Sequence, residues 1–163
     1  MSELVIARLL SSFDFKGKTV ALFLPIARQM ELNTYPLIHY LENRKVKWCI
    51  PKTDLTSWTI AFYSLENIAD IQVNRVGIPE PMNGELIETK HIDVCITPLL
   101  AHDLKGTRIG YGKGCYDKFF STCNPSLKKI GLTVFDRPLE QIEEISCDIK
   151  MDFCITPFTT YRF

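Results

Sequence analysis

Residues 19–25 read TVALFLP, an almost continuous apolar run that stops at a proline. Runs that stay hydrophobic, instead of alternating with polar residues, are typical of strands buried on both faces, and such strands build mostly parallel sheets covered by helices. A proline lacks the N–H that a β-ladder needs, so it predicts where a strand ends. Four further runs share this character, and three of them also stop at a proline: VKWCIP (46–51), DVCITP (93–98), KIGLTVF (129–135) and MDFCITP (151–157).

Helical patterns fill the gaps between these runs. Asn33 or Thr34 can cap a helix that has Pro36 in its first turn, and another helix is expected to begin within KGCYDKFFSTC (113–123). A stripe of apolar residues at helical spacing predicts a helix over residues 3–13; its members are Val5, Ile6, Leu9, Leu10 and Phe13.

The order of these elements predicts the architecture. SWTIAFYSL (57–65) alternates enough to be a further strand, antiparallel and at an edge of the sheet. No linker, repeat or low-complexity tract divides the chain. We therefore expect a single α/β domain over residues 1–163, built in three layers (α/β/α) around a mostly parallel, doubly wound sheet.

Composition excludes several classes of protein. Nineteen basic and nineteen acidic residues cancel, which argues against sequence-independent binding of nucleic acid, because that needs a concentrated basic surface. A hydrophobic content of 46% argues against disorder. No apolar run is long enough for a membrane span, and the first residues lack the pattern of a signal peptide. We expect a cytoplasmic protein with small-molecule partners.

The six cysteines are expected to be reduced thiols. Cys49, Cys95 and Cys154 each lie inside an apolar stretch, where a free cysteine behaves as a small hydrophobic residue. The chain has no C-x-x-C pair, and its histidines are scattered. Neither a disulfide framework nor a zinc site is therefore expected.

One segment has a pattern that a core does not explain. Residues 108–117 read RIGYGKGCYD, with three glycines at alternate positions. The segment follows the predicted strand 93–98 and precedes a helix, which is where ligands gather in parallel sheets. Backbone N–H groups at such a place can bind an anion; Arg108 and Lys113 add positive charge, and Asp117 can hold Mg²⁺. The alternative is a strand-to-helix turn that needs glycine only for its backbone.

These residues are also similar to a known family. DVCITPLLAHDLKGTRIGYGKGCYDKFF (93–120) closely resembles the signature of the 5-formyltetrahydrofolate cyclo-ligase family, also called methenyltetrahydrofolate synthetases. ELNTYPLI (31–38), GIPEP (77–81) and CDIKMDFCIT (147–156) resemble other family segments in the same order. The likeness therefore extends along nearly the whole chain, and the glycine loop is its most specific part.

The resemblance implies an activity. The family converts 5-formyltetrahydrofolate to 5,10-methenyltetrahydrofolate with Mg²⁺ as cofactor and ATP as co-substrate, and it releases ADP and phosphate. The protein's task in such a phosphoryl transfer is to align the reactants and stabilise charge.

The resemblance also implies roles for residues of this chain. Arg108 and Lys113 would be catalytic. Glu31, Phe23 and Tyr116 would contact the folate, and Asp117 with Asp152, or Asp148 in its place, would hold Mg²⁺. The ATP-binding set would be Arg108, Gly110, Tyr111, Gly112, Lys113, Gly114, Cys115, Tyr116 and Asp117.

Departures from the family pattern leave two other interpretations open. Family members open with a longer helix that carries a K-x-x-x-R pair, whereas Arg8 is the sole basic residue of the first predicted helix. Cys115, His102 and Arg137 also differ from the residues usual in the family. The chain would then be a non-catalytic relative that retains ligand binding, or an α/β enzyme acting on a phosphorylated sugar.

Overall fold

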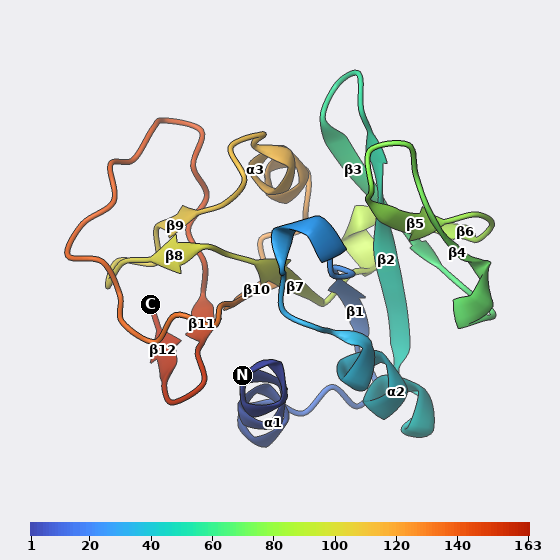
Figure 1. Ribbon diagram of the computed structural model, residues 1–163, viewed down its shortest axis with the longest axis horizontal. Coiled ribbons are helices and arrows are strands. Elements are labelled where there is room, and N and C mark those ends of the chain that lie inside the picture. Colours follow the sequence, from blue (N-terminus) through green and yellow to red (C-terminus); the bar gives the residue numbers. More distant parts are fainter.

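The computed structural model describes all 163 residues and is built on an eight-stranded sheet (Figure 1). The strand order is β12-β11-β10-β7-β1-β2-β3-β6. Neighbours from β11 to β2 are parallel, while β12, β3 and β6 pair antiparallel at the two ends. The bounds of the sheet strands are β1 Thr19–Leu22, β2 Lys47–Asp54, β3 Thr59–Ser64, β6 Glu85–Ile87, β7 Val94–Pro98, β10 Lys128–Leu132, β11 Phe153–Ile155 and β12 Thr160–Arg162.

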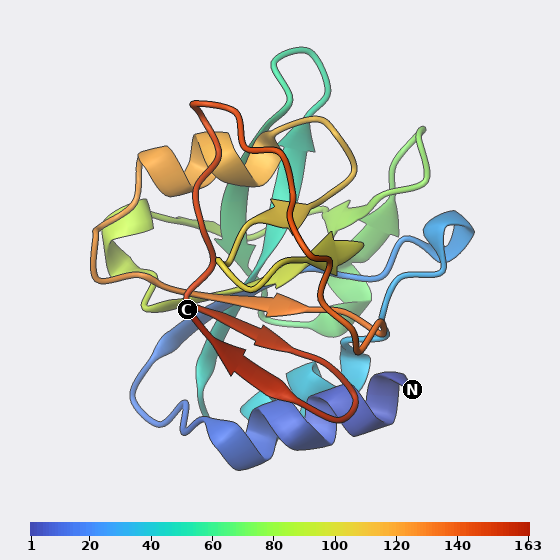
Figure 2. The ribbon, with the colours of Figure 1, turned by 90° about the vertical axis from the view of Figure 1, so that its left-hand side faces the viewer.

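Helices cover both faces of this sheet. Figures 1 and 2 show α1 and α2 on one face and α3 on the other. The predicted three-layer α/β arrangement with a mostly parallel sheet is confirmed. The helices are α1 Ser2–Ser12, α2 Tyr35–Asn43 and α3 Cys115–Ser121, with short 3-10 turns η1 Ala27–Gln29, η2 Ile68–Asp70 and η3 Thr89–His91.

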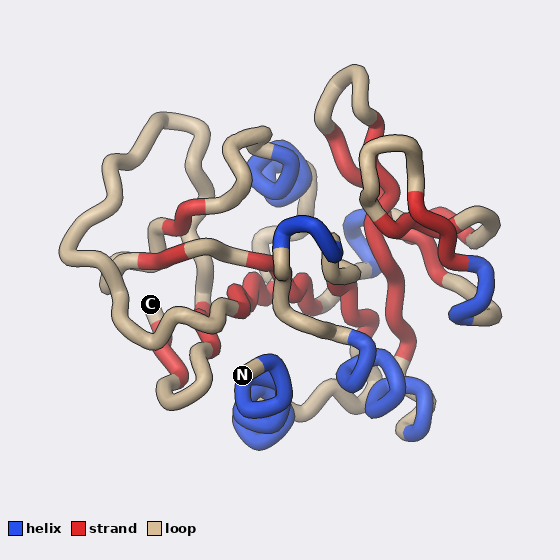
Figure 3. Tube along the Cα trace, viewed as in Figure 1, coloured by secondary structure: helices blue, strands red, loops and turns tan.

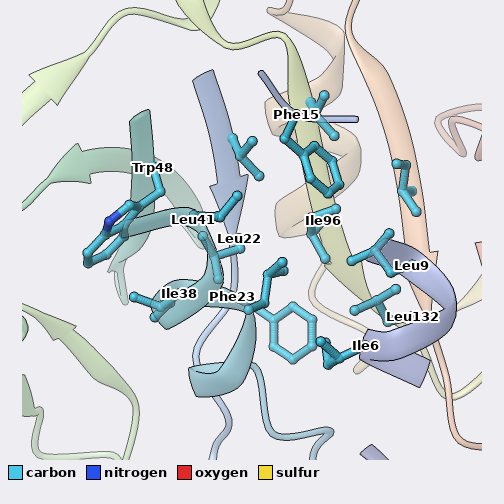
Figure 4. Packing of buried hydrophobic residues seen from close by; sticks show 14 of the residues in the cluster. Ile6, Leu9, Phe15, Leu22, Phe23, Ile38, Leu41, Trp48, Ile96 and Leu132 are labelled. Carbon is cyan, nitrogen blue, oxygen red and sulfur yellow. The ribbon is translucent and has the colours of Figure 1, made fainter. Parts of the chain in front are cut away.

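The larger core cluster lies between the sheet and the pair α1 and α2. Val5, Ile6 and Leu9 of α1 are buried, as the predicted stripe requires. Leu10 and Phe13 pack against the same cluster. Figure 4 shows side chains from α1, α2 and the strands meeting in this layer. Burial of these apolar side chains is the main favourable term for this half of the fold.

A smaller cluster of 9 buried residues lies on the opposite face of the sheet. Phe119 and Phe120 of α3 pack there, and Phe62 of β3 lies 4.8 Å from Phe119 between ring centroids. Cys49 and Cys95 belong to the same layer, so the predicted burial of these thiols is confirmed. Burial raises the pKa of Cys95 to about 12, which keeps that thiol protonated at neutral pH.

Two details of the predicted strands are corrected. Pro51 does not end β2, which continues to Asp54. β2 pairs with β1 only as far as Cys49. Beyond that residue β2 continues paired with β3, and there Pro51 stands opposite Phe62. Pro51 has no N–H to donate, but no donor is needed on the side of β2 that has lost its partner strand, so β2 tolerates the proline. β3 is antiparallel as expected, but it is not the edge strand, because β6 pairs beyond it.

Two short antiparallel pairs were not predicted. β4 (Ile71–Val73) pairs with β5 (Pro79–Pro81), and β8 (Ala101–His102) pairs with β9 (Arg108–Ile109). Figure 3 shows a long stretch without regular structure between β10 and β11. Leu139 in this stretch donates its N–H to the carbonyl of His102, at 2.8 Å, so the stretch runs beside β8.

Candidate active site

A pocket of about 610 Å³ opens beyond the carboxyl ends of the central strands. Phe23 and Leu24, which follow β1, and Pro98, which ends β7, line its base. In parallel sheets this edge is where ligands bind. The remaining walls come from five segments of the chain: the turn 26–31, the β2–β3 hairpin, residues 76–79, the glycine loop 107–117 and the segment 142–150.

The structure brings most of the predicted site residues together. Glu31 and Phe23 line the pocket from one side, and the whole predicted ATP-binding set lines it from the other. Asp152 is the exception. Arg8, the lone basic residue of α1, also lies elsewhere and donates its Nε–H to the carbonyl of Pro157, at 3.2 Å.

Backbone conformation requires some of the loop glycines but not all of them. Gly112 and Gly114 have φ angles of 79° and 65°, in the left-handed region that favours glycine. Gly110 has no positive φ, and nothing lies within 4 Å of the place where a Cβ would stand. Backbone conformation therefore explains two glycines, and the fold alone does not explain Gly110.

Arg108 and Asp117 form a buried ion pair. A guanidinium nitrogen of Arg108 lies 2.7 Å from Oδ1 of Asp117, and the two side chains are only 7% and 17% exposed. Arg108 also donates to the carbonyl oxygen of Ile149, while the Ile149 N–H donates to the same Oδ1 of Asp117 at 2.9 Å. The pair thus holds both backbone polar groups of Ile149 and ties segment 142–150 to the glycine loop.

The predicted metal ligands are partly corrected. Asp152 does not line the pocket: its carboxylate accepts from the backbone N–H of Lys129, and it lies 3.0 Å from Lys129 Nζ beside the amino end of β10. Asp148 lines the pocket instead, next to Ile149. At Asp117 both protein hydrogen bonds go to Oδ1, which leaves Oδ2 without a protein partner. No three His, Cys, Asp or Glu side chains gather as a metal cluster.

Lys113 is the cation of the loop that the fold leaves accessible. It is exposed, and its Nζ lies 4.8 Å from the centroid of the Trp58 ring. Trp58 stands at the tip of the β2–β3 hairpin, and Lys118 of α3 donates to the carbonyl of the adjacent Ser57 at 2.7 Å. Lys113 lines the pocket, whereas Lys118 does not. The hairpin tip is therefore attached to the glycine loop and to α3.

The opposite wall carries an acidic group. Oε2 of Glu31 accepts the N–H of Ile26 at 2.8 Å. Burial raises the pKa of Glu31, and hydrogen bonds from Ile26 and from the Tyr111 hydroxyl offset part of that rise. Burial, with the negative charge of Glu31 next in importance, also raises the pKa of Tyr111. Glu31 and Tyr111 thus connect the two walls across the pocket.

The two predicted aromatic contacts differ. Phe23 is 3% exposed and belongs to the larger core cluster, and Figure 4 shows its ring beside Ile6. The structure therefore favours a core role for that ring. Tyr116 is half-buried, lines the pocket and packs near Phe120 with ring centroids 5.9 Å apart. Burial raises the pKa of Tyr116, so its hydroxyl stays protonated and can donate a hydrogen bond.

Residues 142–146 are the part of segment 142–150 that the sequence did not indicate, since residues 147–150 belong to a stretch that resembles the family and include Asp148. Oδ2 of Asp103 accepts the N–H of Ile142 at 3.2 Å. Thr107 donates to Oε1 of Glu144 at 3.1 Å, and Lys150 lies 3.0 Å from the same oxygen. Residues 142–146 have no hydrophobic period, so no local pattern marks them; their acidic residues are the only signal. Asp103 is a buried turn residue that anchors the segment and does not line the pocket.

Comparisons with known proteins agree with this geometry. The model of the 5-formyltetrahydrofolate cyclo-ligase family matches residues 2–157. The chain is 28% identical over 149 residues to the 5-formyltetrahydrofolate cyclo-ligase of Escherichia coli, which covers 89% of this chain and 81% of that protein. It is also 28% identical over 139 residues to the enzyme of that name from Mycoplasma genitalium, covering 85% and 72%.

Solved structures have the same fold. The NMR structure of Aquifex aeolicus 5,10-methenyltetrahydrofolate synthetase has a TM-score of 0.81 and 31% identity, and it covers 99% of this chain and 80% of that one. The Mycoplasma pneumoniae 5,10-methenyltetrahydrofolate synthetase has a TM-score of 0.72 with 21% identity, covering 95% and 84%. In this chain, no helix has the length and apolar character that crossing a membrane would need.

Proposed function

This chain belongs to the 5-formyltetrahydrofolate cyclo-ligase family of ATP-dependent enzymes, and we propose that it converts 5-formyltetrahydrofolate and MgATP to 5,10-methenyltetrahydrofolate, ADP and phosphate. One observation carries the proposal. The glycine loop 108–117 and Glu31, which come from distant parts of the sequence, line the same pocket.

The proposed reaction has two steps. The formyl oxygen of the folate attacks the γ-phosphorus of ATP, and ADP leaves. N10 then attacks the formyl carbon and loses its proton, which the departing phosphate can take up; the ring closes as phosphate leaves with the former formyl oxygen. Phosphorylation makes that oxygen a good leaving group, so the protein's work is to align the two substrates and to offset charge on the transferred group.

The glycine loop is the proposed phosphate end of the pocket. Gly110 supports this assignment, because the fold leaves open space where its Cβ would be and its φ does not demand glycine. Close approach of a ligand to the backbone explains such a glycine. Backbone N–H groups of the loop would donate to phosphate oxygens, as they do in other anion nests.

The two cations of the loop take different proposed roles. Lys113 is exposed and lines the pocket, so it is the cation assigned to the transferred phosphoryl group. Arg108 lines the pocket as well, but two of its guanidinium nitrogens already donate to Asp117 and to the Ile149 carbonyl. We assign Arg108 chiefly to positioning the loop, with its remaining N–H groups available to phosphate.

Magnesium fits the acidic residues at this end. Oδ2 of Asp117 has no protein partner, and Asp148 lines the pocket beside Ile149. One or two carboxylates completed by phosphate oxygens and water are a usual coordination for Mg²⁺. When bound there, Mg²⁺ would neutralise part of the triphosphate charge. Asp117 and Asp148 would hold it, and Asp152 would not.

The folate end of the pocket is assigned to Glu31 on the opposite wall and to Tyr116, which lies in α3 at the end of the glycine loop. Glu31 presents a carboxylate that accepts hydrogen bonds from the Ile26 N–H and from Tyr111, and a carboxylate can accept further hydrogen bonds beyond these two. Tyr116 presents a ring face and a protonated hydroxyl. These groups would orient the ring that bears the formyl group, and Phe23 would support the pocket from the core.

The activity assay is direct. Purified protein with MgATP and 5-formyltetrahydrofolate is expected to produce the near-ultraviolet absorbance of the methenyl product and a matching amount of ADP. Binding of either substrate without product would support the non-catalytic relative. Absence of both binding and product would contradict the proposed function.

A matched pair of variants tests the phosphate end. Gly112→Ala forces a residue with a Cβ into a left-handed conformation, so it should lower stability by about 1 kcal/mol as well as activity. Gly110→Ala has space for its Cβ in the free protein, so its melting temperature should stay near that of the wild type while the KM for ATP rises several-fold. An unchanged KM for ATP in Gly110→Ala would show that the loop is only a turn.

A further inference from the structure

The turn that carries Glu31 holds a polar atom with no partner. Oε1 of Gln29 is buried and makes no hydrogen bond, and Gln29 lines the pocket. The chain has one other such side-chain atom, Nε2 of His102, which does not belong to a residue of the pocket. Leaving a buried acceptor without a hydrogen-bond partner is unfavourable, so such an atom beside a ligand pocket calls for an explanation.

Local geometry places Gln29 where it is. Gln29 donates its backbone N–H to the carbonyl of Ile26 at 2.9 Å, and Met30 donates to Ala27 at 3.2 Å, so η1 is a closed turn. Met30 then has a φ of 49° and a side chain that is 90% exposed. This reversal sends Met30 to the solvent while both of its neighbours line the pocket.

The turn therefore presents two acceptors to the pocket, beside two donor groups, the guanidinium of Arg28 and the amide NH₂ of Gln29. Gln29 contributes an amide oxygen, and Glu31 contributes a carboxylate that can accept beyond the bonds from Ile26 and Tyr111. A ligand that matches this pair must carry neighbouring N–H donors. The reduced pterin ring of a folate has such a pair of neighbouring donors, N3–H and the 2-amino group.

We propose that Gln29 is a substrate-recognition residue whose Oε1 accepts a hydrogen bond from an N–H of the bound reduced pterin, next to the donors that Glu31 accepts. This inference rests on the proposed function and adds to it a residue that recognises the pterin ring. In the free protein the oxygen has no hydrogen-bond partner, which is unfavourable; the bound folate would supply the missing donor. A ring without that N–H would leave the oxygen buried and unpaired.

The test uses Gln29→Met, which keeps the length of the side chain and removes the acceptor. The matched control is Gln72→Met, because Gln72 is exposed on β4 and does not line the pocket. Equilibrium binding of 5-formyltetrahydrofolate without ATP should weaken about tenfold in Gln29→Met and stay unchanged in the control. The KM for ATP should stay the same in both variants.

A second readout separates recognition from a structural role. Removing an unsatisfied oxygen should leave the melting temperature of the ligand-free protein equal to that of the wild type or higher, whereas a structural glutamine would lower it. A lower melting temperature without folate, or a change in the KM for ATP alone, would overturn the inference.

The outcomes also distinguish this inference from the proposed function. If the wild type binds and converts the folate and Gln29→Met binds it equally well, only the role of Gln29 is lost. If the wild type binds no reduced folate, the proposed function fails and the role of Gln29 fails with it. A weakened variant beside an active wild type supports both.

Discussion

The two walls of the pocket differ in the groups that they present. The glycine loop and segment 142–150 form the donor wall, which carries the ammonium of Lys113 and the proposed Mg²⁺ ligands Asp117 and Asp148. The turn 26–31 forms the acceptor wall, which carries Gln29 and Glu31 and also the guanidinium of Arg28. We propose that phosphate with Mg²⁺ binds the donor wall and that ring N–H groups bind the acceptor wall, a division that would keep two substrates in a single orientation.

The walls also differ in what holds them. The turn 26–31 is closed by bonds between residues a few positions apart. The donor wall depends on a buried ion pair that reaches from Arg108 and Asp117 to Ile149. Damage to the donor wall should therefore reduce stability and activity together, while damage to the acceptor wall should affect binding more than folding.

Loss of the Asp117 side chain is expected to have the largest effect. Asp117→Ala leaves the buried guanidinium of Arg108 without its counter-ion, and breaking a buried pair in this way costs about 3–5 kcal/mol. Denaturant unfolding should record that loss, with activity reduced to background. Glu88→Ala is the control, because it breaks the exposed pair with Lys90 and should leave the stability nearly unchanged. Equal losses in the two variants would contradict the structural role of the pair.

Asp117→Asn sharpens the same point. The asparagine oxygen can still accept from Ile149, so stability should fall less than in the alanine variant, but a neutral amide binds Mg²⁺ more weakly. The activity that remains should need more Mg²⁺. A Mg²⁺ titration with the curve of the wild type would exclude Asp117 as a ligand and leave only its role as partner of Arg108.

The acceptor wall should respond through the folate alone. Glu31→Gln removes a charged acceptor, and hydrogen bonds to charged groups contribute about 1.5–3 kcal/mol, so kcat/KM for the folate should fall about 10-fold to 100-fold. The KM for ATP should stay near that of the wild type. A comparable rise in the KM for ATP would mean that the two walls do not divide the substrates as proposed.

The same residue predicts a pH dependence. Burial raises the pKa of Glu31 above that of an exposed glutamate. As the pH falls through this raised pKa, the carboxylate takes up a proton and loses part of its acceptor capacity, so folate affinity should decline on the acid side. Glu31→Gln should lack this acid limb in a profile of kcat/KM against pH.

A smaller effect is expected at the exposed cation. Lys113→Ala should raise the KM for ATP about tenfold and change the melting temperature little, because an exposed lysine contributes little to folding. Lys118→Ala is matched to it, since Lys118 also reaches the hairpin tip but does not line the pocket. If both variants bind ATP equally weakly, the hairpin contact and not the charge of Lys113 is the important feature.

The smallest effect concerns the scaffold under the donor wall. Burial lowers the pKa of His102, which packs against Tyr161 with ring centroids 4.7 Å apart. The folded protein then binds fewer protons than the unfolded chain below pH ~6.5, so stability is lost as the pH falls toward the lowered pKa, by at most about 1.4 kcal/mol per pH unit. His102→Phe should flatten this slope between pH 7 and 5, as followed by melting temperature.

Sequence patterns identified the elements whose signal is local. The five apolar runs became the five parallel strands of the sheet, because continuous hydrophobicity directly reflects burial on both faces. The glycine loop was predicted from its own glycine spacing, its charges and its place after a strand, whereas Glu31 came from the resemblance to the family; both line the pocket. Pro51 misled the strand assignment, since the sequence does not reveal which edge of β2 is paired.

What only the tertiary structure decided are relations between distant residues. Asp148 and not Asp152 reaches the pocket, Arg108 spends its donors on Asp117 and Ile149, and Gln29 keeps an oxygen without a partner. None of these follows from composition or spacing. Each depends on how segments far apart in the chain pack against one another, because a side chain's partners are set by the surfaces that the folded sheet brings together.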